Sequence, residues 1–151
     1  LLGHLPEAEQ AMRKAVKLEP VGFNYCQVLS FISILRGDTK SALAEAQQES
    51  RQPYRDLNVA LAMQVSPDRA AADAALKMLI DKYAIIAAYQ VGDAYALRKD
   101  PDNMFKWLDR AYAQKDQGLQ GMTADPFLLT YRHDPRFIAL CEKMKLPVPK
   151  T

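Results

Sequence analysis

The sequence predicts an all-α protein built from stacked antiparallel helical hairpins, and two observations point to this class. Apolar residues recur every three or four positions through nearly every segment, which is the spacing of one face of a helix and not of a strand. Gly3 and Ala8 recur 34 positions later as Gly37 and Ala42, a period typical of repeated helical hairpins. Because each hairpin buries its apolar face against the next, we expect a right-handed superhelix.

The first three helices follow from this spacing and from the residues at their ends. An apolar stripe that alternates with charged residues predicts a helix over 6–18, which Pro20 ends. A second apolar stripe predicts a helix over 21–35. Gly37 then provides the turn into a third helix over 39–50.

The later helices are predicted largely from capping residues followed by proline. Ser66 and Asp100 each precede a proline, and this pair is typical of the first turn of a helix. Asp134 precedes Pro135 in the same way, ahead of a final helix that would cover the apolar end of the stack. The expected ranges are 53–65, 67–82, 85–98, 101–113 and 135–145.

Paired helices approach closely only where both carry small side chains. Three pairs of residues twelve positions apart fit this requirement: Ser30 with Ala42, Ala60 with Ala72, and Gly92 with Met104. Met104 is large, but Gly92 opposite it has no side chain, so the combined volume stays small. Glu49 stands where the other hairpins carry Ala or Leu to pack on the next hairpin, so we expect a looser junction there.

Composition excludes several classes of function. Lys and Arg number 20 against 18 Asp and Glu, without a block of like charge, so we expect no nucleic-acid partner. No segment reaches the roughly 18 apolar residues of a membrane span, so we expect no membrane partner and a cytoplasmic location. Cys26 and Cys141 are expected as reduced core thiols, with a disulfide as the alternative. Leu1 is no natural start, so we expect a piece of a longer polypeptide.

Candidate catalytic and metal sites have simpler interpretations. Asp125 and Asp134 resemble paired carboxylates, but each precedes a proline and is expected to begin a helix. His133 with Cys141 suggests a nucleophile and its base, and His4 with His133 a metal site, yet neither has further ligands at a suitable spacing. A small hydrolase that uses His133 is the remaining catalytic alternative. We therefore expect no enzyme, no cofactor and no metal, and we expect 117–123 to be a flexible connection.

Two sets of residues resemble the tetratricopeptide repeat family. The residues that follow the order of the family are Gly3, Ala8, Met12, Ala15 and Pro20 in the first unit, and Gly92, Tyr95, Leu108 and Ala111 in the last. The resemblance covers 1–113 as a half repeat plus three repeats, and it implies that 114–151 is a loop with C-terminal capping helices of the same domain.

The C-terminal part resembles a narrower group. Residues 107–112, 125–127, 133–137 and 144–147 are similar to the tail of tetratricopeptide domains in bacterial signalling proteins. In those proteins the repeats follow a class III adenylate or guanylate cyclase, a winged-helix regulator or a protein kinase. The resemblance implies a regulatory C-terminal part of such a protein, with the output domain upstream of Leu1.

The family resemblance also implies a function, which is to bind a peptide or protein in a concave groove without catalysis. One face of each first helix would line this groove, and in this sequence the face carries Asn24, Gln27, Phe31, Ile34, Tyr54, Leu57, Asn58, Leu61, Gln64, Ile86, Tyr89 and Asp93. The same residues can instead be covered by the chain's own tail or by a second copy. An alternative function is a structural domain that pairs output domains as a homodimer through the face of the N-terminal helix.

Overall fold

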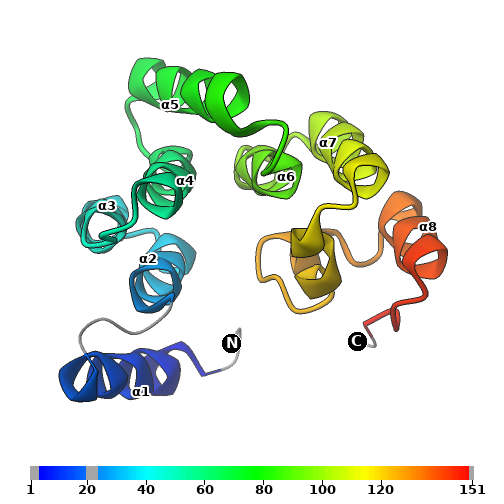
Figure 1. Cartoon of the computed structure of the whole chain (residues 1–151). Coiled ribbons are helices and arrows are strands. Elements are labelled where there is room, and N and C mark those ends of the chain that lie inside the picture. The colour runs from blue at the N-terminus through cyan, green and yellow to red at the C-terminus, as the bar shows by residue number, and fades with distance from the viewer. Residues whose placement is uncertain (1–3, 20–23, 150–151) are drawn as a thin grey trace. The chain divides into compact units, whose positions relative to one another are not determined.

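The computed structural model describes residues 4–19 and 24–149 of the chain. Every regular element in these two ranges is a helix, and neither range contains a strand (Figure 1). The all-α class is therefore confirmed. Two compact units, Leu1–Ala75 and Leu76–Thr151, divide the chain inside helix α5.

Over residues 4–19 and 24–75, the first unit contains four helices and the start of a fifth. Helix α2 packs against α1, α3 and α4, and α3 also packs against α4. The helices are α1 (Leu5–Leu18), α2 (Tyr25–Leu35), α3 (Thr39–Gln47), α4 (Gln52–Met63) and α5 (Arg69–Tyr83), of which the last crosses into the second unit.

Capping interactions in the first unit fix where its helices begin. Gly37, with a φ of 73°, provides the turn before α3, and the Asp38 carboxylate accepts a hydrogen bond from the Ser41 N–H at 3.0 Å. Helix α2 begins later than residue 21, because Asn24 adopts the left-handed conformation. Residues 20–23, with the predicted stop at Pro20, lie outside the described residues. Helix α5 begins after Asp68, and the cap predicted at Ser66 is wrong.

The position of Asp68 explains this second correction. Its carboxylate accepts a hydrogen bond from the Ala71 N–H at 3.0 Å, which is the usual geometry of an N-cap. The Ser66 hydroxyl instead accepts from the Asp68 N–H at 3.2 Å. The serine therefore shapes the turn that precedes the helix.

Over its described residues, 76–149, the second unit contains three α-helices after α5 and two short 3₁₀ helices. The elements are α6 (Ala88–Leu97), α7 (Pro101–Gln114), η1 (Gln117–Gly121), η2 (Leu128–Tyr131) and α8 (Pro135–Met144). Asp100 and Asp134 cap α7 and α8 as predicted, with carboxylates that accept from the Asn103 N–H at 3.1 Å and the Arg136 N–H at 2.9 Å. Helix α6 starts three residues later than predicted.

The small residues predicted at the hairpin contacts are buried. Ser30 and Ala42 are fully covered, and the Ser30 hydroxyl donates a hydrogen bond to the Ala42 carbonyl at 2.9 Å. Ala60 and Ala72 are also fully covered. At Gly92 an added Cβ would lie 2.9 Å from Cδ2 of Leu108, so any larger residue there would have to displace the buried Leu108 side chain where α6 meets α7.

Glu49, where the sequence predicts a looser junction, is buried and paired. The residue is only 6% exposed, and its carboxylate accepts from the Arg51 Nε at 2.9 Å, the Arg51 Nη2 at 3.0 Å and the Arg51 N–H at 2.9 Å. The side-chain hydrogen bonds from Arg51 lower the pKa of Glu49. A bidentate ion pair therefore fills the position where other hairpins carry an apolar residue.

Two further features concern the whole described chain. Cys26 and Cys141 are free thiols, as expected, and Cys141 is buried. Among the helices of residues 4–19 and 24–149, none combines the length and the apolar content that crossing a membrane requires.

Substituting Gly92 tests the close contact between α6 and α7. Gly92→Val should destabilise the protein by about 1–3 kcal/mol, because its Cβ would collide with the buried Leu108 side chain. Chemical denaturation with circular dichroism measures this change. Ala113→Val, on the exposed side of α7, is the control and should cost about 0.5 kcal/mol. Equal stabilities of the two variants would contradict the contact.

Candidate binding faces of the two units

The structure divides the residues predicted to line the groove into buried and accessible sets. Six of the twelve are buried by the protein itself and are not available to a partner in this structure: Ile34, Asn58, Leu61, Gln64, Tyr89 and Asp93. Two are exposed, namely Tyr54 and Ile86, and the remaining four, Asn24, Gln27, Phe31 and Leu57, are half-buried. The prediction that one face of each helix lies open is thus corrected for half of its residues.

Gln64, which was predicted to line the groove, is instead bonded to the backbone of α4 and α5. Its amide nitrogen donates hydrogen bonds to the carbonyl oxygens of Ala60 at 2.6 Å and Ala72 at 3.3 Å. Both alanines belong to the small-residue pair predicted between α4 and α5. Gln64 therefore joins these two helices from within the core.

Helices α2 and α4 of the first unit retain accessible side chains. Gln27 and Phe31 are four residues apart on α2, so they share one face of that helix. Tyr54 and Leu57 are three residues apart on α4, and Tyr54 is 43% exposed. The Arg51 guanidinium lies 4.4 Å from the centroid of the Tyr54 ring. We call these four residues, Gln27, Phe31, Tyr54 and Leu57, the α2–α4 face.

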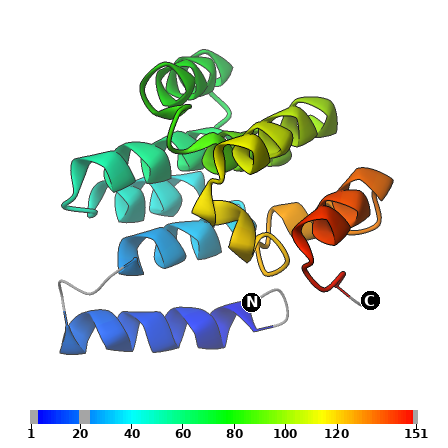
Figure 2. The ribbon, with the colours of Figure 1, turned by 45° about the vertical axis from the view of Figure 1, so that its right-hand side comes forward.

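In the second unit, residues 116–131 of the chain pack against helix α6, which carries two of the predicted groove residues. Tyr89 and Asp93 are four residues apart on α6 and are almost completely buried. Ile86 is 70% exposed, because it belongs to the turn that precedes the helix. The cover is residues 116–131, which we call the cap segment. Its first helix, η1, packs against both α6 and α7 (Figures 1 and 2).

Two aspartates fasten the cap segment to Tyr89. The Tyr89 N–H donates to Oδ2 of Asp116 at 3.0 Å, and the Tyr89 hydroxyl donates to Oδ2 of Asp125 at 2.9 Å. The other oxygens of these carboxylates accept from the N–H groups of Gly118 at 2.9 Å and Phe127 at 2.8 Å. Each aspartate therefore orders the cap segment and holds it on α6.

Where the sequence predicts a flexible connection over 117–123, residues 117–121 form a 3₁₀ helix that contacts α6. A Cβ added at Gly118 would lie 2.7 Å from the ring of Tyr89, so this glycine permits direct contact between η1 and α6. The Tyr131 hydroxyl donates to the carbonyl of Ala96 at 3.0 Å. The alternative in which the chain's own tail covers the predicted residues thus holds for α6.

Asp93 lies near Tyr89, Asp116 and Asp125 and carries a buried oxygen without a described hydrogen-bond partner. Its side chain is 2% exposed, and its Oδ1 atom has no hydrogen-bond partner in the part of the chain that the structure describes. Burial raises the pKa of Asp93 well above its usual range, and the negative charges of Asp125 and Asp116 raise it further. Burial also raises the pKa of Asp125. The geometry therefore favours a neutral Asp93 carboxyl.

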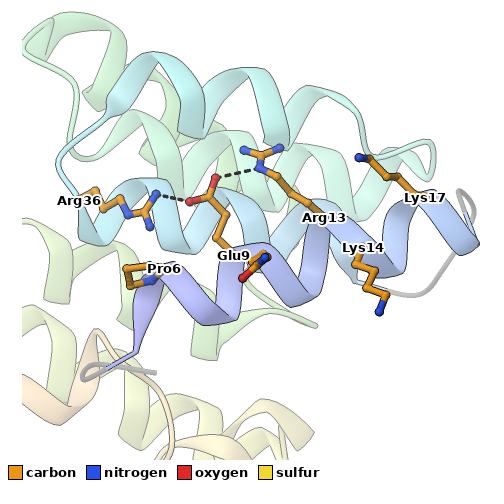
Figure 3. Close-up of a pocket in the computed structure, with 7 residues that line it drawn as sticks. Pro6, Glu9, Arg13, Lys14, Lys17 and Arg36 are labelled. Carbon is orange, nitrogen blue, oxygen red and sulfur yellow. Dashed lines mark hydrogen bonds and ion pairs between the residues drawn. The ribbon is translucent and has the colours of Figure 1, made fainter.

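A hollow of about 530 Å³ lies on the first unit beside α1. Figure 3 shows Glu9 between two arginines, with its carboxylate accepting from the Arg13 Nε at 2.8 Å and from Arg36. These hydrogen bonds, that of Arg13 first, lower the pKa of Glu9. Arg13 also donates to Glu45 at 3.0 Å. The arginines therefore already pair with the protein's own carboxylates and attach α1 to its neighbours.

The described residues were also searched for metal sites, and the chain was compared with known proteins. Within residues 4–19 and 24–149, no group of three or more His, Cys, Asp or Glu residues is arranged to hold a metal ion. His133 is exposed, and Asp134 is engaged as the cap of α8. No protein-family model, curated protein or solved structure matches the chain.

Sequence reasoning did not identify Asp116 or the cap segment. Asp116 lies 27 residues after Tyr89, and Asp125 lies 36 residues after it. One local signal was present, since an aspartate two residues before a glycine is typical of a turn. That signal predicts local order, but it does not predict which helix the turn covers.

Substituting Gly118 tests the contact between the cap segment and α6. Gly118→Ala should destabilise the protein by about 1–3 kcal/mol, because its Cβ would press on the Tyr89 ring close to the backbone. Gly121→Ala is the matched control in the same 3₁₀ helix, since its added Cβ would meet no atom within 4 Å. Thermal unfolding compares the two variants, and equal melting temperatures would show that η1 does not rest on Tyr89.

Proposed function

We propose that this chain is a non-catalytic interaction module that binds a peptide or protein through the α2–α4 face. The observation that carries the proposal is that α2 and α4, which pack together, each keep predicted groove residues accessible: an exposed tyrosine with a half-buried leucine on α4, and a half-buried phenylalanine and glutamine on α2. Apolar and aromatic anchors beside amide groups suit the recognition of an extended or helical peptide.

The proposal includes a tetratricopeptide-like arrangement of the hairpins and a right-handed superhelix. Its support is that residues in the order of the family occupy packing positions, since Gly92, Leu108 and Ala111 are all buried. The capping of α7 and α8 by Asp-Pro pairs also fits a stack of short hairpins. A regulatory role in a larger bacterial signalling protein, in the cytoplasm, belongs to the same proposal.

Binding is expected to depend on the anchors of α4. A peptide library displayed on phage and selected against the full chain should yield binders whose affinity falls about 30-fold in the double variant Tyr54→Ala, Leu57→Ser, which corresponds to ~2 kcal/mol for loss of central anchors. Isothermal titration calorimetry measures the affinities. Tyr112→Ala, which removes an exposed aromatic ring from α7 of the other unit, is the control and should bind as the wild type does.

Two outcomes would overturn the proposal. The first is that the selected peptides bind the double variant and the wild type equally, provided that circular dichroism shows both proteins to be folded. The second is that Tyr112→Ala weakens binding as much as the double variant does, because the binding surface would then lie on the second unit.

A specific observation favours a second candidate function, which is the pairing of output domains as a homodimer. No residue of helix α1 is fully buried, and Ala8, Met12 and Ala15 of its apolar stripe are only half-buried although α1 packs against α2. Burying a large apolar side chain completely contributes about 1.5–3 kcal/mol relative to full exposure, so covering the remaining area would contribute part of this. A second copy of α1 would cover this stripe.

Self-association through α1 is expected to depend on Met12. In this second candidate the chain forms a dimer at high concentration, and Met12→Glu shifts it to monomer because a charge would enter the apolar contact. Light scattering coupled to size-exclusion chromatography measures the mass. Lys14→Glu is the control and should leave the dimer intact. A wild-type chain that stays monomeric at high concentration would eliminate this function.

A further inference from the structure

We propose that the cap segment, residues 116–131, is a pH-operated cover on α6 that the proton on the buried Asp93 carboxyl keeps closed and that loss of this proton opens. The proposal concerns the second unit and does not depend on whether the α2–α4 face of the first unit binds a partner. It assigns a role to a buried polar cluster that packing alone does not explain.

The first support is the position of Asp93 relative to the attachments of the cap segment. Asp93 lies one helical turn after Tyr89, and Tyr89 is the residue that both attachments use, through its N–H to Asp116 and its hydroxyl to Asp125. Both attachments are carboxylates. An ionised Asp93 would therefore repel the groups that hold the cover in place.

The second support is that nothing described around Asp93 compensates a negative charge. Its Oδ1 atom lacks a hydrogen-bond partner among the described residues, and a buried carboxylate without partners is strongly disfavoured. The titratable groups that act on it are Asp125 and Asp116, both of which favour its neutral form, and Tyr89 on its own helix. Helix α7 meets α6 at Gly92 through Leu108 and Met104, which carry no charge.

The third support is that the polar attachments of the cap segment converge on α6. The contact of Gly118 with the Tyr89 ring and the hydrogen bond from the Tyr131 hydroxyl to Ala96 add to those of the two aspartates. Leu119, Met122, Phe127 and Leu128 of the segment are also buried, so opening exposes them and is a rare event that hydrogen exchange is suited to detect. Opening admits water to the Asp93 carboxyl, which then ionises at the ordinary pH for an aspartate. Opening also uncovers Tyr89, an aromatic residue that the sequence analysis assigned to a binding surface.

The direction of the pH dependence follows from proton linkage. The closed form holds the Asp93 proton more tightly than the open form, so the closed form is favoured at low pH and loses its advantage as the pH rises. Between the ordinary carboxyl pKa of about 3.9 in the open form and the raised pKa in the closed form, the opening constant should rise up to tenfold for each pH unit. Above the raised pKa it should level off.

Hydrogen exchange of the full chain measures this opening constant. We expect amides of residues 116–131 to lose protection between pH 5 and pH 9, after correction for intrinsic exchange, while amides within α7 keep theirs over the same range. Asp93→Asn, which replaces the carboxyl with a neutral group of similar shape, should keep the cover protected with a weaker pH dependence than the wild type, the remainder coming from Asp125, whose pKa burial also raises. Asp109→Asn, on the exposed side of α7, is the matched control and should behave as the wild type does.

A second measurement needs no variant and covers the case in which Asp93→Asn does not fold. Carbon-13 NMR of the Asp93 carboxyl in the wild type should show titration in the same pH range as the loss of protection at Gly118. An Asp93 carboxyl that is ionised while the cover is still closed would overturn the proposal. So would an Asp93→Asn protein that folds and loses protection with the same pH dependence as the wild type.

Discussion

Close contact between paired helices at small side chains is the constraint on which the rest of the structure depends. Ser30 and Ala42 are completely covered, and the hydroxyl of the serine is satisfied by the carbonyl of the alanine. Gly92 leaves no room for even one methyl group beside Leu108. Side chains that are small or absent allow the backbones to approach, and the larger apolar residues of each helix can then interdigitate around the contact.

The two units differ in how far their predicted groove residues are covered, and our proposals for their roles follow from this difference. The second unit covers α6 with residues 116–131 and uses Tyr89, Asp116 and Asp125 to hold them there. The first unit leaves an aromatic and an amide-bearing surface on α2 and α4 partly accessible. The same kind of surface can therefore be closed in one unit and available in the other, which is why we place partner binding on the first unit and regulation on the second.

Features that depend on neighbouring residues were predictable from the sequence. The helical class, the buried small residues and the Asp-Pro starts of α7 and α8 rest on local periodicity and capping, and all three are confirmed. The ion pair of Glu49 with Arg51 was not predictable from the repeat pattern, because it is a property of two side chains and the pattern considers one position at a time. Ser66 and Asp68 are both suitable caps, and only the actual start of α5 distinguishes them.

Features that depend on contacts distant in the sequence were not predictable in this way. The cap segment covers α6 through hydrogen bonds between residues 27 and 36 positions apart, and no periodicity encodes such contacts. The predicted groove therefore included Tyr89 and Asp93. These two residues share one face of α6 as predicted, but they are buried and the cap segment packs on this helix. The accessible part of the candidate site, Tyr54 with Gln27 and Phe31, was included in the prediction, but nothing in the sequence distinguished it from the buried part.

The most direct test of the close helix contact is a nuclear Overhauser spectrum of the methyl-labelled protein. The structure predicts strong cross-peaks between the α-protons of Gly92 and the methyl groups of Leu108, because a Cβ built at Gly92 would stand only 2.9 Å from a Leu108 methyl carbon. An assigned spectrum of the folded protein without these cross-peaks would mean that α6 and α7 do not meet at the glycine, and the account of the fold would be contradicted.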